Sequence, residues 1–231
     1  MESFTPYLLG GGVAVLVGLD RTAALQIMIS RPLVAGPLVG LLLGEVVIGL
    51  TIGMLLEFLW LCRMPVGASI PHDDTQVAVG ATTLAIALSG TTGRGIGLTL
   101  CALLVALPLG KIGQFIERTV RSRNQRLPAT AQSALEQGEI PAIARLHFLG
   151  LGNFALGALT TYIVIVLIGR WLVIIASPYV LDLLTMQAAW IKLALILVGV
   201  AALLQSLNVR HAYALFFGGF LLSFFLLSVL R

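Results

Sequence analysis

RPLVAGPLVGLLLGEVVIGLTIGMLLEFLWLCRMPVGASIPHDDTQ, residues 31–76, is the stretch that decides how the rest of the chain is interpreted. Residues 32–61 are nearly all apolar, yet they contain Pro37, several glycines and two acids, Glu45 and Glu57. A soluble helix is not apolar on every side over such a length. Ionisable groups at membrane depth face a cavity, a partner or a substrate, and broken helices there mark transporter binding sites. We therefore expect the functional site in this stretch.

The composition supports a membrane protein. The chain has 231 residues, of which 58% are hydrophobic and 10% charged, and its mean hydropathy is +1.03. At about 20 residues per span, this length allows roughly six to eight crossings or half-crossings. We predict an all-α integral membrane protein, a polytopic helical bundle with broken or re-entrant helices, forming one membrane-embedded domain over residues 1–231. The net charge of +4 does not indicate a nucleic-acid partner.

The basic residues gather in one polar region, 117–147, and just before it. Six of the 14 Lys and Arg fall between 111 and 145: Lys111, Arg118, Arg121, Arg123, Arg126 and Arg145. Such clustering is typical of a cytoplasmic loop. The loop is expected to hold a short surface helix that ends at Gly138. Its basic residues are explained by topology alone, or by contact with anionic membrane lipids or a soluble partner.

Several apolar segments flank the central run. Residues 7–19 form a first segment, and 20–31 are expected to be either an interfacial amphipathic helix or a connection packed against other helices. The central run splits near Gly44 into pieces of about 12 and 17 residues, which suits a re-entrant hairpin or a discontinuous helix. Later spans are expected at 96–115 (kinked at Pro108), 148–168, 171–184 (broken at Pro178), 190–204 and 211–230.

Glu57 is the first candidate ligand. On a helix, Gly53 lies one turn earlier on the same face, which leaves open space beside the carboxylate. A carboxylate accepts hydrogen bonds from sugar hydroxyls well. The alternative is a structural ion pair with a buried arginine such as Arg63 or Arg94.

The second candidate group follows in the loop after the central run. Of the adjacent acids Asp73 and Asp74, at most one is expected to face a ligand, because neighbouring side chains point in different directions. His72 is either a titrating functional group or, more commonly at such a place, a structural hydrogen-bonding residue. The segment offers too few oxygen ligands for Mg²⁺. The sequence thus predicts no metal site, no catalytic residue and no cofactor.

Two further polar residues have two readings each. Glu45 follows a glycine turn, so it either caps a helix N-terminus or contacts the ligand. Asn153 lies within the apolar run 149–157, where a neutral amide either holds helices together or hydrogen-bonds a sugar hydroxyl.

From Arg31-Pro32-Leu33 through residues 38–45 to Glu57 and Asp73, the sequence resembles a known family. It is similar to the IIC membrane component of the mannose/fructose/sorbose class of the bacterial sugar phosphotransferase system. The match is good over residues 20–80 and looser beyond. Three positions depart from the family pattern: Glu45 replaces the usual Asp, His72 replaces Pro, and Asp74 replaces a small residue.

The resemblance implies a sugar-translocating subunit of the bacterial inner membrane with several crossings, and not an enzyme. Its partners would be a IID membrane subunit and soluble IIA and IIB phosphocarriers, with IIB phosphorylating the sugar, and it would form oligomers. Glu57 and Asp73 would be the ligand carboxylates, with Glu45 in a more structural place. Three alternatives stay open: an orphan or regulatory subunit of the same ancestry, a stand-alone ion-coupled transporter, and an intramembrane Mg²⁺-dependent prenyltransferase, which should show two separated acidic motifs.

Overall fold

The computed structural model describes residues 4–61, 70–206 and 211–229. These residues form helices without strands, which confirms the all-α prediction. In chain order the helices are α1 (Thr5–Thr22), α2 (Pro32–Leu42), α3 (Val46–Leu59), α4 (Asp74–Ala87), α5 (Ile96–Asn124), α6 (Leu127–Glu136), α7 (Ile140–Met186), α8 (Ala188–Ser206) and α9 (Ala212–Val229). In this part of the chain, three segments are long and apolar enough to cross a membrane: Ile96–Glu136, Ile140–Met186 and Ala188–Ser206.

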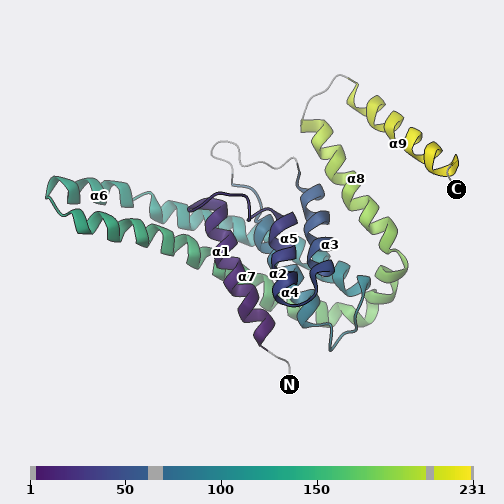
Figure 1. Cartoon of the computed structure of the whole chain (residues 1–231), viewed down its shortest axis with the longest axis horizontal. Helices are drawn as coiled ribbons and strands as arrows, with labels where there is room; N and C mark the ends of the chain where they lie inside the picture. Colours follow the sequence, from purple (N-terminus) through teal and green to yellow (C-terminus); the bar gives the residue numbers. More distant parts are fainter. Residues whose placement is uncertain (1–3, 62–69, 207–210, 230–231) are drawn as a thin grey trace.

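Helix α4 is the centre of the bundle. Helices α1, α2, α3, α5 and α7 all contact it (Figure 1), and every residue from Thr75 to Ala85 is buried. Its many small side chains allow close packing, which is how helices associate where no water drives them together. At Gly80, a β-carbon would meet the side chain of Ile165 at 2.6 Å. The polar groups at the two ends of α4 are therefore held by a well-packed frame.

Helices α2 and α3 form a tight hairpin. Its turn contains Gly44 at φ +78°, in the left-handed region that favours glycine. The two backbones approach closely along a glycine seam, because a β-carbon at Gly49 would lie 2.7 Å from the carbonyl carbon of Gly36. The two helices have 11 and 14 residues, each too short to span a bilayer alone. The predicted break of the central run near Gly44 and Glu45 is confirmed.

Residues 23–31 are a packed connection, and the alternative of an amphipathic helix over 20–31 is wrong. Helix α1 ends at Thr22, and Leu25, Gln26 and Met28 all have positive φ. The cause is Asp20, whose carboxylate accepts hydrogen bonds from the N–H groups of Ile27 and Ser30 at 2.8 and 3.0 Å, which folds the chain back over the end of α1.

The basic region 117–147 is largely helical rather than an irregular loop. The second half of α5, all of α6 and the first part of α7 form an arm that projects from the bundle, with α6 at its far end (Figure 1). Pro128 and Pro141 fall in the first turns of α6 and α7, where no N–H is needed, so they start helices instead of ending them. Gly138, at φ +75°, makes the turn after α6, as predicted.

Helix α7 continues through Pro178, so the expected break of the segment 171–184 at this proline is wrong. Proline removes the N–H that would bond to the carbonyl of Ile174. The hydroxyl of Ser177 donates to that carbonyl at 3.1 Å instead. Apolar helices tolerate proline when a neighbouring hydroxyl satisfies the freed group in this way.

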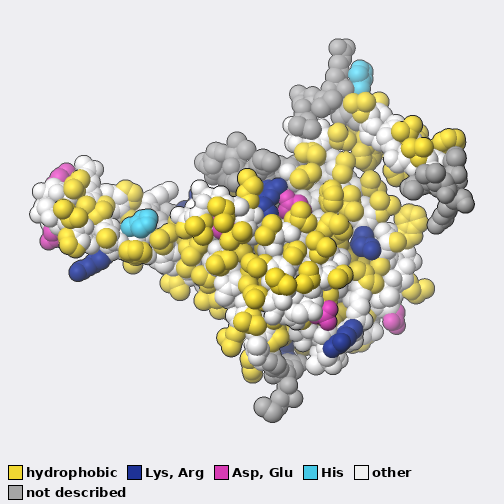
Figure 2. Space-filling model, in the orientation of Figure 1, with side chains coloured by type: hydrophobic (Ala, Val, Ile, Leu, Met, Phe, Trp, Pro, Cys, Tyr) yellow, Lys and Arg dark blue, Asp and Glu magenta, His cyan; other side chains and the backbone are white. Residues whose placement is uncertain are grey.

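Much of the outer surface is apolar. Figure 2 shows hydrophobic side chains over most of the visible face, and α8 and α9 extend from the bundle at one side (Figure 1). Helix α9 exposes aromatic side chains such as Phe217, Phe224 and Phe225, each at least 60% exposed. A surface of this kind is expected where lipid or apolar protein, and not water, surrounds the chain.

Candidate functional site

Arg21, near the end of α1, holds a cluster of charged groups at the start of α4. Its Nη1 lies 3.1 Å from Oδ1 of Asp73 and also donates to Oδ1 of Asp74. Its Nε lies 3.8 Å from Oε2 of Glu117 on α5. Its Nη2 donates to the carbonyl oxygen of His72 at 3.0 Å. One guanidinium thus connects α1, α4 and α5.

These charges are largely removed from solvent. Asp73 is 6% exposed, Glu117 9%, and the Arg21 side chain 14%. Glu117 also pairs with Arg121 at 2.6 Å, one helix turn further along α5. Because an unpaired charge is very costly in such surroundings, each group depends on its partners. Three carboxylates face two guanidiniums, which leaves the cluster with one excess negative charge.

The start of α4 fixes the two acids. Oδ1 of Asp73 accepts from the backbone N–H of Gln76 at 3.0 Å and so caps the helix. The N–H of Asp73 donates to the carbonyl of Gly110 on α5 at 3.1 Å. Gly113 brings the two helices close, since a β-carbon there would meet that of Asp73 at 2.6 Å. Arg21 contacts both Asp73 and Asp74, although neighbouring side chains were expected to point in different directions. Which of the two acids faces a ligand stays a prediction.

Glu57 joins the same network through the connection between α1 and α2. Its Oε1 lies 2.6 Å from Nη2 of Arg31, and its Oε2 accepts from the N–H of Leu33 at 3.3 Å. The carbonyl of Ser30, beside Arg31, accepts from the hydroxyl of Thr75 at 2.7 Å, and Thr75 in turn contacts Arg21.

The structure therefore brings Glu57 and Asp73 into one continuous set of contacts, which we call the polar network: Arg21, Ser30, Arg31, Glu57, Asp73, Asp74, Thr75, Glu117 and Arg121. The structural partner of Glu57 is Arg31, so the alternative of Arg94 is wrong, and Arg63 lies outside the described residues.

A small cavity lies inside the polar network. It has a volume of about 20 Å³ and is bounded by Arg21, Asp73, Gln76, Glu117 and Thr161, among others. The side-chain nitrogen of Gln76 donates to the carbonyl of Ala14 at 2.8 Å, whereas its buried oxygen has no partner among the described residues. The space suits one water molecule and not a sugar.

A larger cavity, of about 340 Å³, lies at the other end of α4. Glu45 and Thr51 border it from the hairpin, and Ser89, Arg94 and Thr99 from the α4–α5 connection and the first turn of α5. Glu45 stands at the N-cap of α3, the position that the capping alternative predicts, although its side chain makes no capping hydrogen bond. Neither Glu45 nor Arg94 forms an ion pair within the part of the chain that the structure describes.

Asn153 lies apart from both ends. Its amide nitrogen donates to Oδ1 of Asn124 at 2.7 Å, and the amide nitrogen of Asn124 donates to the carbonyl of Gly150 at 3.1 Å. These bonds tie α7 to α5 at the base of the arm. Among the described residues, no contact joins Asn153 to the polar network, so its geometry is that of a group that holds helices together.

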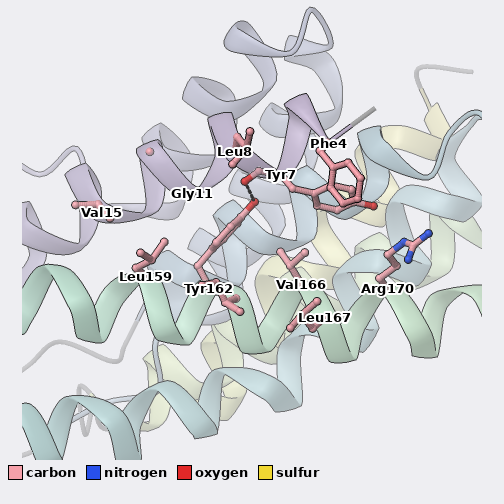
Figure 3. A pocket seen from close by; sticks show the side chains of 12 residues that line it. Phe4, Tyr7, Leu8, Gly11, Val15, Leu159, Tyr162, Val166, Leu167 and Arg170 are labelled. Carbon is pink, nitrogen blue, oxygen red and sulfur yellow. Dashed lines mark hydrogen bonds between the residues drawn. The ribbon is translucent and has the colours of Figure 1, made fainter. Parts of the chain in front are cut away.

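A third cavity is apolar. It has a volume of about 690 Å³ and lies between α1 and α7, where Leu8, Val166 and Leu167 line it (Figure 3). The hydroxyl of Tyr162 on its wall already donates to the carbonyl of Tyr7 at 2.8 Å. Sugars need many hydrogen-bonding partners, so this cavity suits a hydrocarbon chain better than a carbohydrate.

Sequence reasoning missed part of the site. Glu117 and Gln76 were not considered, and no sequence pattern indicated that Arg21 pairs with Asp73. Glu117 stands at the start of a run of basic residues. A single acid at such a place was the only sequence signal that could have marked Glu117 as a site residue. Gln76 follows the acids by one helix turn, which would have placed it on the face of Asp73.

Comparisons with known proteins identify the family of the chain. A family model described as the PTS system sorbose-specific IIC component matches residues 5–230. The mannose-specific EIIC component of Escherichia coli K12 is 33% identical over 122 residues, which cover 53% of this chain but only 43% of that protein. The fructose permease IIC component of Bacillus subtilis is 29% identical over 195 residues, covering 84% of this chain and 70% of the relative.

Solved structures show the same fold. A chain described as a membrane protein superimposes with a TM-score of 0.73 at 24% identity, covering 97% of this chain and 88% of the other. A chain from the cryo-EM structure of the mannose transporter ManYZ with microcin E492 gives a TM-score of 0.62 at 25% identity, with the same coverage. The resemblance found in the sequence is confirmed: the chain belongs to the family of sorbose-specific IIC components of the sugar phosphotransferase system.

Proposed function

We propose that this chain is the membrane permease subunit of a phosphoenolpyruvate-dependent phosphotransferase system, which binds a hexose-type sugar and carries it across the bacterial inner membrane. The observation that carries the proposal is the polar network, which links Glu57, paired with Arg31, to Asp73, paired with Arg21, through Ser30 and Thr75. In this proposal the chain performs no chemistry itself, and a soluble IIB protein phosphorylates the sugar.

The network has the chemistry of a sugar site in its closed form. Carboxylates accept hydrogen bonds from sugar hydroxyls, and a guanidinium donates them in a planar fork. When Arg21 leaves the acids, Asp73 would be free to accept hydroxyls in its place, whereas Glu117 would keep its ion pair with Arg121. We assign Glu57 and Asp73 as ligand carboxylates, Asp74 as their neighbour on Arg21, and His72 as a positioning residue through its carbonyl.

The closed network also suits alternating access. A carrier must hold the pathway shut at one end while the other end is open, and ion pairs that form and break are a common way to make two states of similar free energy. Replacing the Arg21 contacts by sugar contacts would offset the cost of opening. The amide of Asn153 stays with the helix packing in this proposal.

The arm gives an orientation. Its basic residues place it on the cytoplasmic side by the positive-inside rule, and the polar network lies at the arm end of α4. We propose that phosphorylation takes place at this end, by IIB that has received its phosphoryl group from IIA. A IID subunit would complete the membrane unit, because the mannose relative is solved as a ManYZ complex, and copies of the unit would associate as a homo-oligomer.

Sugar uptake into vesicles tests the proposal. Vesicles containing this chain and its candidate IID partner would be given mannose, fructose, sorbose and amino sugars, with and without phosphorylated IIB. Accumulation of sugar phosphate only with phosphorylated IIB, lost in Glu57→Gln and Asp73→Asn, is the expected result. Uptake that is indifferent to IIB would indicate an ion-coupled or facilitative carrier. No uptake by a correctly assembled complex would favour the orphan-subunit alternative.

A further inference from the structure

We propose that the 340 Å³ cavity at the hairpin tip is a second sugar site, the entry vestibule on the outer face, with Glu45 and Arg94 as its charged ligands. This inference rests on the proposed function and extends it to a place that is separate from the polar network. We call this cavity the tip cavity.

The tip cavity and the polar network lie on opposite sides of the protein. Asp73 contacts α5 at Gly110 and Gly113, whereas the tip cavity includes Gly95, at the N-cap of α5. From Gly95 to Gly113 is 18 helical residues, which span about 27 Å at about 1.5 Å per residue. A bilayer has a hydrocarbon core of about 30 Å. If the arm end is cytoplasmic, the tip cavity opens where unphosphorylated sugar arrives.

The charged groups of the tip cavity are available to a ligand. Glu45 and Arg94 are both exposed, and within the described residues neither side chain forms a hydrogen bond or an ion pair. They come from different elements, the hairpin turn and the α4–α5 connection. One acceptor and one forked donor across a cavity match the mixed donor and acceptor hydroxyls of a sugar.

Three hydroxyls complete the lining. Thr51, Ser89 and Thr99 each donate to a carbonyl of their own helix, at 2.8, 2.8 and 3.1 Å. Their donors are therefore used, which leaves their oxygens only as acceptors for a ligand. The volume falls within the roughly 300–1,000 Å³ of small-molecule sites. With opposite charges on its walls, the cavity suits a neutral polyol better than a sugar phosphate.

A polar stripe on α4 links the two sites. Thr75, Thr82 and Ser89 are spaced by seven residues, so they lie on one face of the helix or its extension. Thr75 belongs to the polar network and Ser89 to the tip cavity. Thr82, between them, is fully buried, and its hydroxyl has no partner among the described residues. It lines neither cavity, so in this proposal a sugar would contact it only after the helices around α4 move apart.

Sided transport kinetics test the inference. In right-side-out vesicles holding the complete membrane complex and enclosed phosphorylated IIB, Glu45→Gln and Arg94→Gln should each raise the half-saturating sugar concentration about tenfold, the loss of one charged hydrogen bond. In inside-out vesicles, where sugar and IIB reach the cytoplasmic face directly, the half-saturating concentration for phosphorylation should stay within about twofold. Glu139→Gln on the arm and Lys192→Gln on α8 are matched charge controls.

The outcomes separate the two proposals. If the wild-type complex makes no sugar phosphate, the proposed function fails and this inference fails with it. If the wild type is active and both tip variants keep the outer half-saturating concentration, the vestibule is contradicted and the proposed function stands. A tip variant that inserts poorly would lower the maximal rate on both faces equally. Glu45→Asp would then decide, because it keeps a carboxylate on the same wall of the cavity, and failure to recover the outer half-saturating concentration would count against the vestibule.

Discussion

The two ends of α4 carry similar polar groups in opposite states. At the arm end, the charges of Arg21, Asp73 and Glu117 are buried and satisfy one another around a cavity of about 20 Å³. At the hairpin end, Glu45 and Arg94 line a cavity of about 340 Å³ and form no ion pair with any described residue. The difference lies in pairing rather than in residue type.

This comparison gives a physical meaning to open and closed. A buried carboxylate that has a guanidinium partner is stable but unavailable, whereas an exposed carboxylate without one can bind a ligand at little cost. A carrier that exchanges these states would break ion pairs at one end while it organises charges at the other. The following predictions test whether the two ends differ in this way.

Arg21→Gln should have the largest effect on stability. It leaves Asp73, Asp74 and Glu117 without their shared cation, and breaking a buried pair costs about 3–5 kcal/mol. Thermal unfolding of the purified protein in detergent measures the loss, and Arg94→Gln is the matched control because Arg94 is exposed. Equal unfolding temperatures for the two variants would show that the arm end is no more strongly paired than the tip end.

Gly49→Ala should have the next largest effect. The new β-carbon would meet the carbonyl carbon of Gly36 at 2.7 Å. It would therefore push α2 and α3 apart within the hairpin. Overpacking of this kind costs about 1–3 kcal/mol. Gly90→Ala is the control, since nothing lies within 4 Å of a β-carbon there. Thermal unfolding in detergent measures the loss. An unfolding temperature that Gly49→Ala leaves unchanged would contradict the close contact between α2 and α3.

Glu57→Gln should separate binding from stability. Its partner Arg31 has a side chain that is 41% exposed, so the ion pair contributes no more than about 1 kcal/mol to folding. If Glu57 is a sugar ligand, the half-saturating concentration for uptake should nevertheless rise about tenfold. Uptake kinetics and unfolding are measured on the same preparation. A protein that is strongly destabilised but binds sugar normally would assign Glu57 to structure alone.

Asn153→Ala should have the smallest effect. It removes one amide hydrogen bond between α5 and α7, and such bonds within membrane proteins average about 0.6 kcal/mol. Sugar affinity should not change, because Asn153 has no described contact with the polar network. Uptake kinetics provide the check. A clear rise in the half-saturating concentration would return Asn153 to the ligand set.

Local signals in the sequence were sufficient to predict the hairpin and to select the candidate ligand acids. The hairpin follows from Gly44 within an apolar run, and the importance of Glu57 and Asp73 follows from acids at membrane depth. Both are local properties. The break at Pro178 was wrong because a neighbouring hydroxyl, Ser177, replaces the missing donor, and proline alone does not reveal this.

The remaining features depend on tertiary contacts. Arg21 and Asp73 are 52 positions apart, and the pairing of Glu117 with Arg21 requires α5 to cross α4 beside the end of α1. No sequence pattern specifies which charges meet. The helical arm was mistaken for a loop because its composition is polar, although its prolines stand in the first turns of helices. Polarity indicates exposure to water and does not indicate irregular structure.

The most direct test of the central claim is thiol accessibility at the two ends of α4. In a Cys62→Ser, Cys101→Ala background, Ser89→Cys would report the tip cavity and Thr161→Cys the cavity of the polar network. We predict that a membrane-impermeant maleimide added outside modifies Ser89→Cys, that Thr161→Cys resists it from either face, and that sugar with phosphorylated IIB exposes Thr161→Cys to the cytoplasmic side. Ready modification of Thr161→Cys at rest, with Ser89→Cys protected, would contradict the account.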